Sequence, residues 1–253
     1  MRINTNAQAL NMVNNIKKTS NELKTSMEKL SSGKKINRAS DDPAGLIISE
    51  RMRAQIVAVE QEISNIENNY NKYATADGNL QTQQNSLQEM RDIALEAANE
   101  GGNSEKTQEA LQRSMDNTVQ SYNNVQNSAS FGVQKLFDGS DGSVADLEPM
   151  TSIDISSPEK AQEAVEQIDQ KMNEVAELRG EIGSKQKNDL EARRNNLETE
   201  LVNLTAAESA VRDVDMAKEY TNLVNKEIQL KSSMAILAHQ NQTPNLVLNF
   251  IGK

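Results

Sequence analysis

The stretch SAVRDVDMAKEYTNLVNKEIQLKSSMAILAHQNQTPNLVLNFIGK, residues 209–253, decides how the rest of the chain folds. Side chains in it recur at alternating steps of four and three residues, the spacing of the a and d positions of a coiled coil. A stripe this narrow needs a partner helix, because it cannot enclose a core alone. Only Glu227 interrupts its apolar character, and its members are Met216, Tyr220, Leu223, Glu227, Leu230, Met234 and Leu237.

The end of this stretch departs from the helical pattern. Pro244 is predicted to end the helix, because proline lacks a backbone N–H and its ring clashes with the preceding turn. An apolar tail follows, in which Leu246 and Leu248 are expected to pack in the same inner assembly.

The beginning of the chain offers the partner helix, because apolar side chains at similar spacing run through residues 1–31. We expect the two termini to pair as a coiled coil, forming one inner domain from residues 1–42 and 209–253. The apolar edge left on this pair is most simply covered by other copies of the chain. On the N-terminal side the packing residues are expected to be Ile3, Ala7, Leu10, Ile16, Leu23, Met27 and Leu30.

The composition favours narrow helical seams over a broad core. Mean hydropathy is -0.70, and aromatic residues make up 3% of the chain. Apolar residues make up 36%, against roughly 45–50% in ordinary domains. The chain has no cysteine, so disulfides and thiol chemistry are excluded. No apolar run is long enough to span a membrane, and the first fifteen residues lack the apolar region of a Sec-type signal peptide. These features alone predict a cytosolic protein.

The net charge of -10 is unevenly distributed. Residues 1–45 carry +4 and residues 209–253 carry +1, so the middle carries -15. An acidic middle argues against nucleic-acid binding, which needs a basic stripe. The more apolar, nearly neutral ends are typical of segments that become buried in an assembly.

Residues 43–208 are predicted to form a helical rod. One helix is expected from Pro43 to about residue 99, a second begins near Ser104, and a small β-hairpin lies near residues 131–155. A further helix begins at Pro158 and continues into the terminal helix after about Ala206. Asp42 and Ser157 precede prolines and are expected to cap their helices. The predicted fold is mainly α, an elongated antiparallel helical bundle with a coiled coil of the N- and C-terminal helices.

The residues give no sign of catalysis. His239 is the sole histidine, and no metal-binding motif, nucleophile–base set or phosphate-binding loop is present. The many carboxylates alternate with lysine and arginine, as on a solvated helix face. We therefore expect no enzymatic activity, no metal and no cofactor.

Several motifs are more specific. LSSGKKINRASDDPAGL (30–46) with SERMR (49–53) resembles the N-terminal segment of bacterial flagellins, and ESAVRDVDMAKE (208–219) with LAHQNQTPNLVL (237–248) resembles their C-terminal segment. FGVQKLFDG (131–139) is similar to the family's FNGxxLLDG turn. The resemblance covers essentially the whole chain. About 18 residues separate Gly139 from Pro158, where most flagellins insert outer domains, so the chain resembles a minimal flagellin.

The resemblance implies a structural subunit that polymerises with copies of itself into the flagellar filament for motility, its terminal helices forming the innermost tube. It implies export in an unfolded state through the flagellar type III apparatus, with an export chaperone and a filament cap protein as further partners. The expected location is then the bacterial flagellum outside the cell, or the periplasm if the source is a spirochaete. This replaces the cytosolic prediction.

In many flagellins a stretch LQRxRELAVQ contacts neighbouring subunits and a vertebrate innate immune receptor. Here the stretch reads LQEMRDIALE (87–96), in which Leu87, Gln88 and Arg91 match, Glu89 replaces a basic residue and Ile93 replaces leucine. A charge reversal at a contact typically costs one to several kcal/mol. The resemblance therefore implies weakened receptor activation.

The sequence bears differently on three other functions. A hook–filament junction protein shares the terminal motifs, but the chain has no long divergent middle. Some flagellins carry a zinc protease in their outer region, which a chain with one histidine and no such insertion does not match. A monomeric helical adaptor differs from a filament subunit in that it would not sediment as a polymer.

Overall fold

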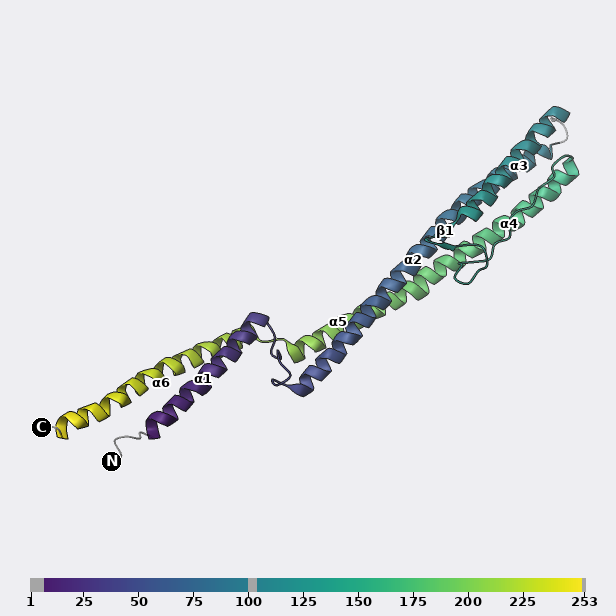
Figure 1. Cartoon of the computed structure of the whole chain (residues 1–253). Coiled ribbons are helices and arrows are strands. Elements are labelled where there is room, and N and C mark those ends of the chain that lie inside the picture. Colours follow the sequence, from purple (N-terminus) through teal and green to yellow (C-terminus); the bar gives the residue numbers. More distant parts are fainter. Residues whose placement is uncertain (1–6, 100–103, 252–253) are drawn as a thin grey trace. The chain divides into compact units, whose positions relative to one another are not determined.

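The computed structural model describes residues 7–99 and 104–251, with side chains as far as residue 242. Most of this part of the chain is helical (Figure 1), which confirms the mainly α fold. None of the described helices is both long enough and apolar enough to cross a membrane. The elements are α1 (Ala7–Ser32), α2 (Pro43–Ala97), α3 (Glu105–Ser128), β1 (Ser130–Phe131), β2 (Gln134–Lys135), α4 (Pro158–Ser184), the π-helix η1 (Lys185–Glu191), α5 (Ala192–Arg212) and α6 (Met216–Ile251).

The chain divides into two compact units. The first, here the terminal unit, comprises Met1–Val59 and Glu200–Lys253, and the second, the central unit, comprises Glu60–Thr199. Helices α2 and α5 contribute residues to both. The buried apolar residues are unevenly shared, because among the described residues all of them except Ile36 and Val59 belong to the central unit.

In the terminal unit α1 and α6 lie side by side and antiparallel (Figure 1), so the predicted pairing of the two ends is confirmed. Two cross-helix contacts define the register. Lys226 Nζ lies 2.5 Å from Glu22 Oε2, and Gln240 Nε2 donates to Gln8 Oε1 at 3.5 Å. The number of residues from Gln8 to Glu22 on α1 equals the number from Lys226 to Gln240 on α6, as expected for two straight antiparallel helices.

The linker between α1 and α2 is tied to the break between α5 and α6. Gly33 ends α1 with φ 71°, a conformation that glycine adopts without strain. The amide of Lys35 donates to Arg212 O at 2.6 Å, and the amide of Val214 donates to Gly33 O at 3.0 Å. Ile36 beside this ladder is 1% exposed. A Cβ on Gly45 would lie 2.7 Å from Ile36 Cδ1, so the close approach of the linker to α2 requires glycine there.

Three predicted helix starts are confirmed. Asp42 Oδ1 accepts from the amide of Gly45 at 2.9 Å in front of α2. Ser104 and Ser157 are the N-caps of α3 and α4, and each hydroxyl accepts an amide three residues further on. Such caps stabilise a helix because its first amides have no partner within the helix.

Two predicted helix boundaries are wrong. The helix that begins at Pro158 was expected to continue into the terminal helix, but α5 ends at Arg212 and α6 begins at Met216. The cause is local, because Asp215 Oδ1 accepts from the amide of Lys218 at 3.0 Å and so caps a new helix. Pro244 was expected to end α6, which instead continues to Ile251. A proline removes one backbone donor, and the remaining hydrogen bonds can carry a helix past it.

The core of the central unit lies between α2, α3, α4 and the extended chain before α4. Leu87 on α2, Tyr122 on α3 and Ile168 on α4 are each 0% exposed. The hairpin is shorter than expected, because only β1 and β2 pair as strands. Residues 143–157, here called the strap, continue from it to α4. They form an isolated antiparallel bridge between Asp146 and Asp138, and they bury Leu147, Met150, Ile153 and Ile155.

Amide side chains of α3 hold the strap in place of a neighbouring strand. Gln112 donates to Ile153 O and accepts from the amide of Ile155, both at 2.8 Å. Asn123 makes the same kind of two-way contact with the backbone of Met150 at 2.8 and 2.9 Å. Gln108 and Gln126 each donate one further bond to the strap. The buried backbone groups of the strap are thereby satisfied.

Candidate assembly interface

Large apolar side chains are exposed mainly in the terminal unit. Among the described residues only Tyr70, Leu95 and Val133 of this kind belong to the central unit. Exposed apolar residues that gather on one part of a protein typically mark an interaction surface. Those of the terminal unit are Leu10, Met27, Ile47, Ile48, Val57, Val202, Met216, Tyr220, Ile228, Met234 and Ile236.

The face that α6 turns to α1 is half polar. The partly buried face of α6 alternates Leu223, Leu230 and Leu237 with polar residues, including Lys226 and Ser233. On α1 the facing stripe consists of Ala9, Met12, Ile16, Thr19, Leu23, Ser26 and Leu30, and Ser26 is the one described residue of α1 that is buried. Coiled-coil pairs derive their stability from apolar a and d positions. The polar residues on α6 therefore limit the stability that this pair gains from its own contact.

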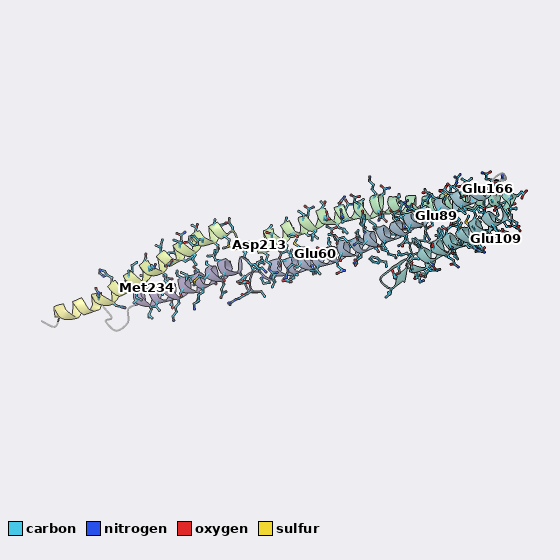
Figure 2. The ribbon with its side chains drawn as sticks, turned by 90° about the horizontal axis from the view of Figure 1, so that it is seen from above. Glu60, Glu89, Glu109, Glu166, Asp213 and Met234 are labelled. Atoms are coloured by element: carbon cyan, nitrogen blue, oxygen red, sulfur yellow. The ribbon has the colours of Figure 1, made fainter. Side chains whose placement is uncertain are left out.

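The structure divides the predicted stripe of α6 into two faces. Leu223, Leu230 and Leu237 are partly buried on the α1 side. Met216, Tyr220 and Met234 are 50%, 61% and 48% exposed, and Glu227 lies among them, also exposed. We call Met216, Tyr220 and Met234 the open flank of α6, and Met234 is labelled in Figure 2. The open flank is apolar surface that α1 does not cover.

The predicted packing residues of α1 divide in the same way. Leu23 and Leu30 are partly buried, whereas Ala7, Leu10 and Met27 are exposed. Ile3 lies outside the described residues, as do the side chains of Leu246 and Leu248.

The Glu22–Lys226 pair contributes charge complementarity to this contact. The hydrogen bond from Lys226 lowers the pKa of Glu22 below its ordinary value. Because the carboxylate is favoured in the folded chain, the pair stabilises pairing above the pKa that Glu22 has when unfolded. That contribution is lost as the pH falls through the lower, folded pKa.

A pH titration of the Glu22→Gln variant tests this pair. The variant is expected to have fewer paired terminal helices than the natural chain at pH 6. The difference should vanish once the pH falls below the lowered pKa of Glu22, because the glutamate side chain is then as neutral as glutamine. Circular dichroism of the full chain at low concentration measures it. Glu227→Gln is the matched control, because Glu227 pairs with Lys231 on its own helix. An equal loss in both variants would contradict a cross-helix role for Glu22.

The second predicted contact region lies on α2, in the central unit. Gln88 and Glu89 are exposed, and Glu89 is labelled in Figure 2. Arg91 Nε lies 2.7 Å from Asp169 Oδ1 of α4, an ion pair that raises the pKa of Arg91. Ile93 is partly buried, and Leu87 is 0% exposed. Leu87 therefore packs in the core, and the surface open to a partner here comes from the other residues.

Sequence reasoning missed several exposed apolar residues. Ile47, Ile48 and Val57 on α2 are 56%, 46% and 63% exposed, and Val202 on α5 is 67% exposed. Adjacent isoleucines place apolar groups on two faces of a helix, since successive residues are about 100° apart. This signal was available in the sequence. The amide side chains that hold the strap gave no comparable signal, because glutamine and asparagine are abundant throughout the chain.

Two protein families match most of the chain. The family described as the bacterial flagellin N-terminal helical region matches residues 3–141, and the bacterial flagellin C-terminal helical region matches residues 165–251. The chain belongs to the bacterial flagellin family. The N-terminal match covers α1, α2, α3 and the hairpin, and the C-terminal match covers most of α4 and continues to Ile251 of α6.

Three curated relatives match along their full length. A flagellin of Halalkalibacterium halodurans is 36% identical over 274 residues, covering 99% of this chain and 100% of the relative. A flagellin of Bacillus subtilis is 32% identical with the same coverage of both chains. The flagellar filament 33 kDa core protein of Treponema phagedenis is 29% identical, again covering 99% and 100%. In this flagellin the residues between the two family matches are the strap and the first turns of α4.

Proposed function

We propose that this flagellin is a structural subunit that polymerises into the flagellar filament for motility, and that its terminal unit makes the polymer contacts. The observation that carries the proposal is the open flank of α6. Three large apolar side chains face solvent there, while the face that α6 turns to α1 is half polar. Each of them gains about 1 kcal/mol when its exposed half is buried. Copies of the same chain, present at high local concentration in a polymer, supply the cover.

The difference in buried apolar surface between the two units supports this proposal. The central unit has its own core, so one copy can hold it folded. The terminal unit has little buried apolar surface, so contacts with neighbouring copies of the chain would stabilise its helices. Head-to-tail contacts between identical chains generate helical polymers when the rotation between copies does not close a ring.

The finer parts of the proposal rest on the family. Membership supports export through the flagellar type III apparatus, with an export chaperone and a filament cap protein as transient partners. The location is then the flagellum outside the cell. The relative from Treponema phagedenis, a flagellar filament core protein, supports the periplasm as the setting if the source is a spirochaete. The full-length relatives favour a filament subunit over a hook–filament junction protein.

Electron microscopy with sedimentation tests the proposal. Purified chain under polymerising conditions is expected to form filaments that pellet on ultracentrifugation, with a critical concentration below which no pellet forms. A monomeric adaptor would stay in the supernatant at every concentration. Protein that remains monomeric under conditions that polymerise the relative from Bacillus subtilis would overturn the proposal.

Receptor activation offers a separate prediction. Glu89 is exposed on α2, at the position of the basic residue in the stretch LQRxRELAVQ of many flagellins. Glu89→Arg is therefore expected to raise the potency of this flagellin on receptor-bearing reporter cells by about tenfold. One restored charge contact of about 1.4 kcal/mol corresponds to that change. Glu60→Arg is the matched control, because Glu60 is exposed on the same helix and lies away from this stretch (Figure 2). Full potency in the natural chain would contradict the expected weakening.

A further inference from the structure

The apolar row of α4 and α5 contains one residue more than its repeat. Buried or partly buried side chains recur every seven residues along α4 and again along α5, but Leu190 follows Ile182 by eight. A second row shows the same step, since Arg194 follows Gln186 by eight. Each residue of an α-helix turns the chain by about 100°. One extra residue would therefore turn the row of α5 away from α2. The first row is Ile168, Val175, Ile182, Leu190, Leu197, Leu204 and Val211.

The π-helix η1 lies where the extra residue falls. It spans Lys185–Glu191, and its hydrogen bonds run from residue i to i+5, so each turn holds more residues than a turn of α-helix. The additional residue is thereby absorbed. Contacts with α2 continue on both sides of η1, where Arg179 Nε lies 2.8 Å from Asp77 Oδ1 and Arg193 pairs with Glu62.

Packing is poorer at η1 and beyond it than in α4. Helix α4 buries Ala161, Ala164, Ile168, Val175 and Ile182, whereas η1 and α5 bury none of their residues. Two cavities border η1. One of about 450 Å³ is lined by residues including Tyr73, Ile182 and Lys185, and one of about 240 Å³ is lined by residues including Ile66, Tyr70 and Leu190.

The residues just before η1 weaken the helix further. A Cβ on Gly180 or Gly183 would meet no atom within 4 Å. Close packing therefore does not require glycine at either position. Glycine in a helix interior favours unfolding of the helix relative to alanine, because it has more backbone freedom to lose. The two glycines, the extra residue and the two cavities occur together within one short part of the central unit.

We propose that η1 is a joint built into the central unit. The extra residue keeps the apolar row of α5 on the α2 side at the expense of tight packing. Residues 185–199 therefore open and move independently of α4, which stays fixed by its buried row. The joint lets the continuous helix formed by α4, η1 and α5 combine a tightly packed segment with a mobile one.

Deletion of Asp189 tests the joint. Asp189 is exposed, and removing it restores the seven-residue step between Ile182 and the next leucine. The π-helix is then expected to become α-helix, the Tm to rise by about 2–4 °C, and amide exchange in residues 185–199 to slow at least about tenfold. Deletion of Glu177, another exposed acidic residue, is the matched control. It breaks the repeat within α4 and is expected to lower the Tm.

Spin-label distances test the motion directly. The chain has no cysteine, so labels can be placed at will. Asn68→Cys with Asn195→Cys reports on the segment after η1, and Glu89→Cys with Glu166→Cys reports on the packed part; all four residues are exposed. The first pair is expected to give a broad distance distribution that narrows on deletion of Asp189, and the second a narrow one in both chains. Equal widths for the two pairs in the natural sequence, or a Tm lowered by deleting Asp189, would overturn the proposal.

Discussion

Removal of residues 246–253 is expected to abolish filament formation while leaving the central unit folded. On α6 the contact with α1 reaches Gln240, which bonds to Gln8 next to the first described residue of α1. Helix α6 continues beyond that level to Ile251. The removed residues include Leu246, Val247, Leu248, Phe250 and Ile251. Each apolar side chain of this size contributes about 1.5–3 kcal/mol when fully buried. The loss of all five is therefore expected to remove most of the free energy that stabilises the contact between subunits.

The truncation must separate assembly from folding. The described core of the central unit lies between residues 76 and 182, so its Tm and helical circular dichroism signal are expected to change little. Removal of Gly252 and Lys253 alone is the control, since neither residue has a large apolar side chain. That variant should form filaments at the same critical concentration as the full chain. Normal assembly of the longer truncation would show that the tail does not contribute to the inner contacts.

Met234→Asp is expected to raise the critical concentration for polymerisation at least about a hundredfold. Met234 is 48% exposed on the open flank, so the single copy loses little when it is replaced. In the polymer the substitution removes apolar burial and places an unpaired carboxylate in a desolvated contact, which costs several kcal/mol. A change of 2.8 kcal/mol corresponds to about a hundredfold. Sedimentation over a concentration series measures it.

Gln229→Asp provides the control for this substitution. Gln229 is exposed on α6, and five residues along a helix place it well away from Met234 around the axis. It is expected to leave the critical concentration within about threefold of the natural value. Helicity and Tm of the monomer should be equal in both variants. Equal losses of assembly in the two variants would mean that added charge, rather than the open flank, controls polymerisation.

Local signals in the sequence predicted the helix starts and the pairing of the termini. Asp42 before Pro43 and Ser157 before Pro158 act over a single turn, through hydrogen bonds to amides three residues further on. Gly33 likewise ends α1 in the left-handed conformation expected of it. Such features depend on a few neighbouring residues, and the printed sequence contains them in full.

The choice of face on α6 could not be predicted in the same way. Leu223, Leu230 and Leu237 border polar residues on one side and the open flank on the other. Periodicity identifies an apolar stripe, but both sides of these leucines satisfy the four-three spacing. The contact with α1 selects the polar side because Glu22 and Lys226 meet there. That choice depends on charges far apart in the sequence.

The sequence shows the skip that η1 absorbs, but it does not show that a π-helix absorbs it. The eight-residue step from Ile182 to Leu190 is visible without a structure. A skip in a repeat can be absorbed by a bend, by a change of partner or by a wider turn, and the sequence does not choose among them. On α2 the facing residues Ile66, Tyr73, Leu80 and Leu87 keep a seven-residue spacing without a skip. This regular partner surface favours the wider turn.

The amide side chains of α3 that hold the strap separate the core from the turn that precedes the strap. Gln112 and Asn123 fix the strap from Met150 onward, whereas Ser140 and Asp141 are exposed in a turn with Gly139 and Gly142 at positive φ. A guest peptide grafted between Ser140 and Asp141 would meet solvent, while the anchored stretch behind it keeps its place. The chain thus has a natural display position, where foreign sequences could be carried in many copies along a polymer.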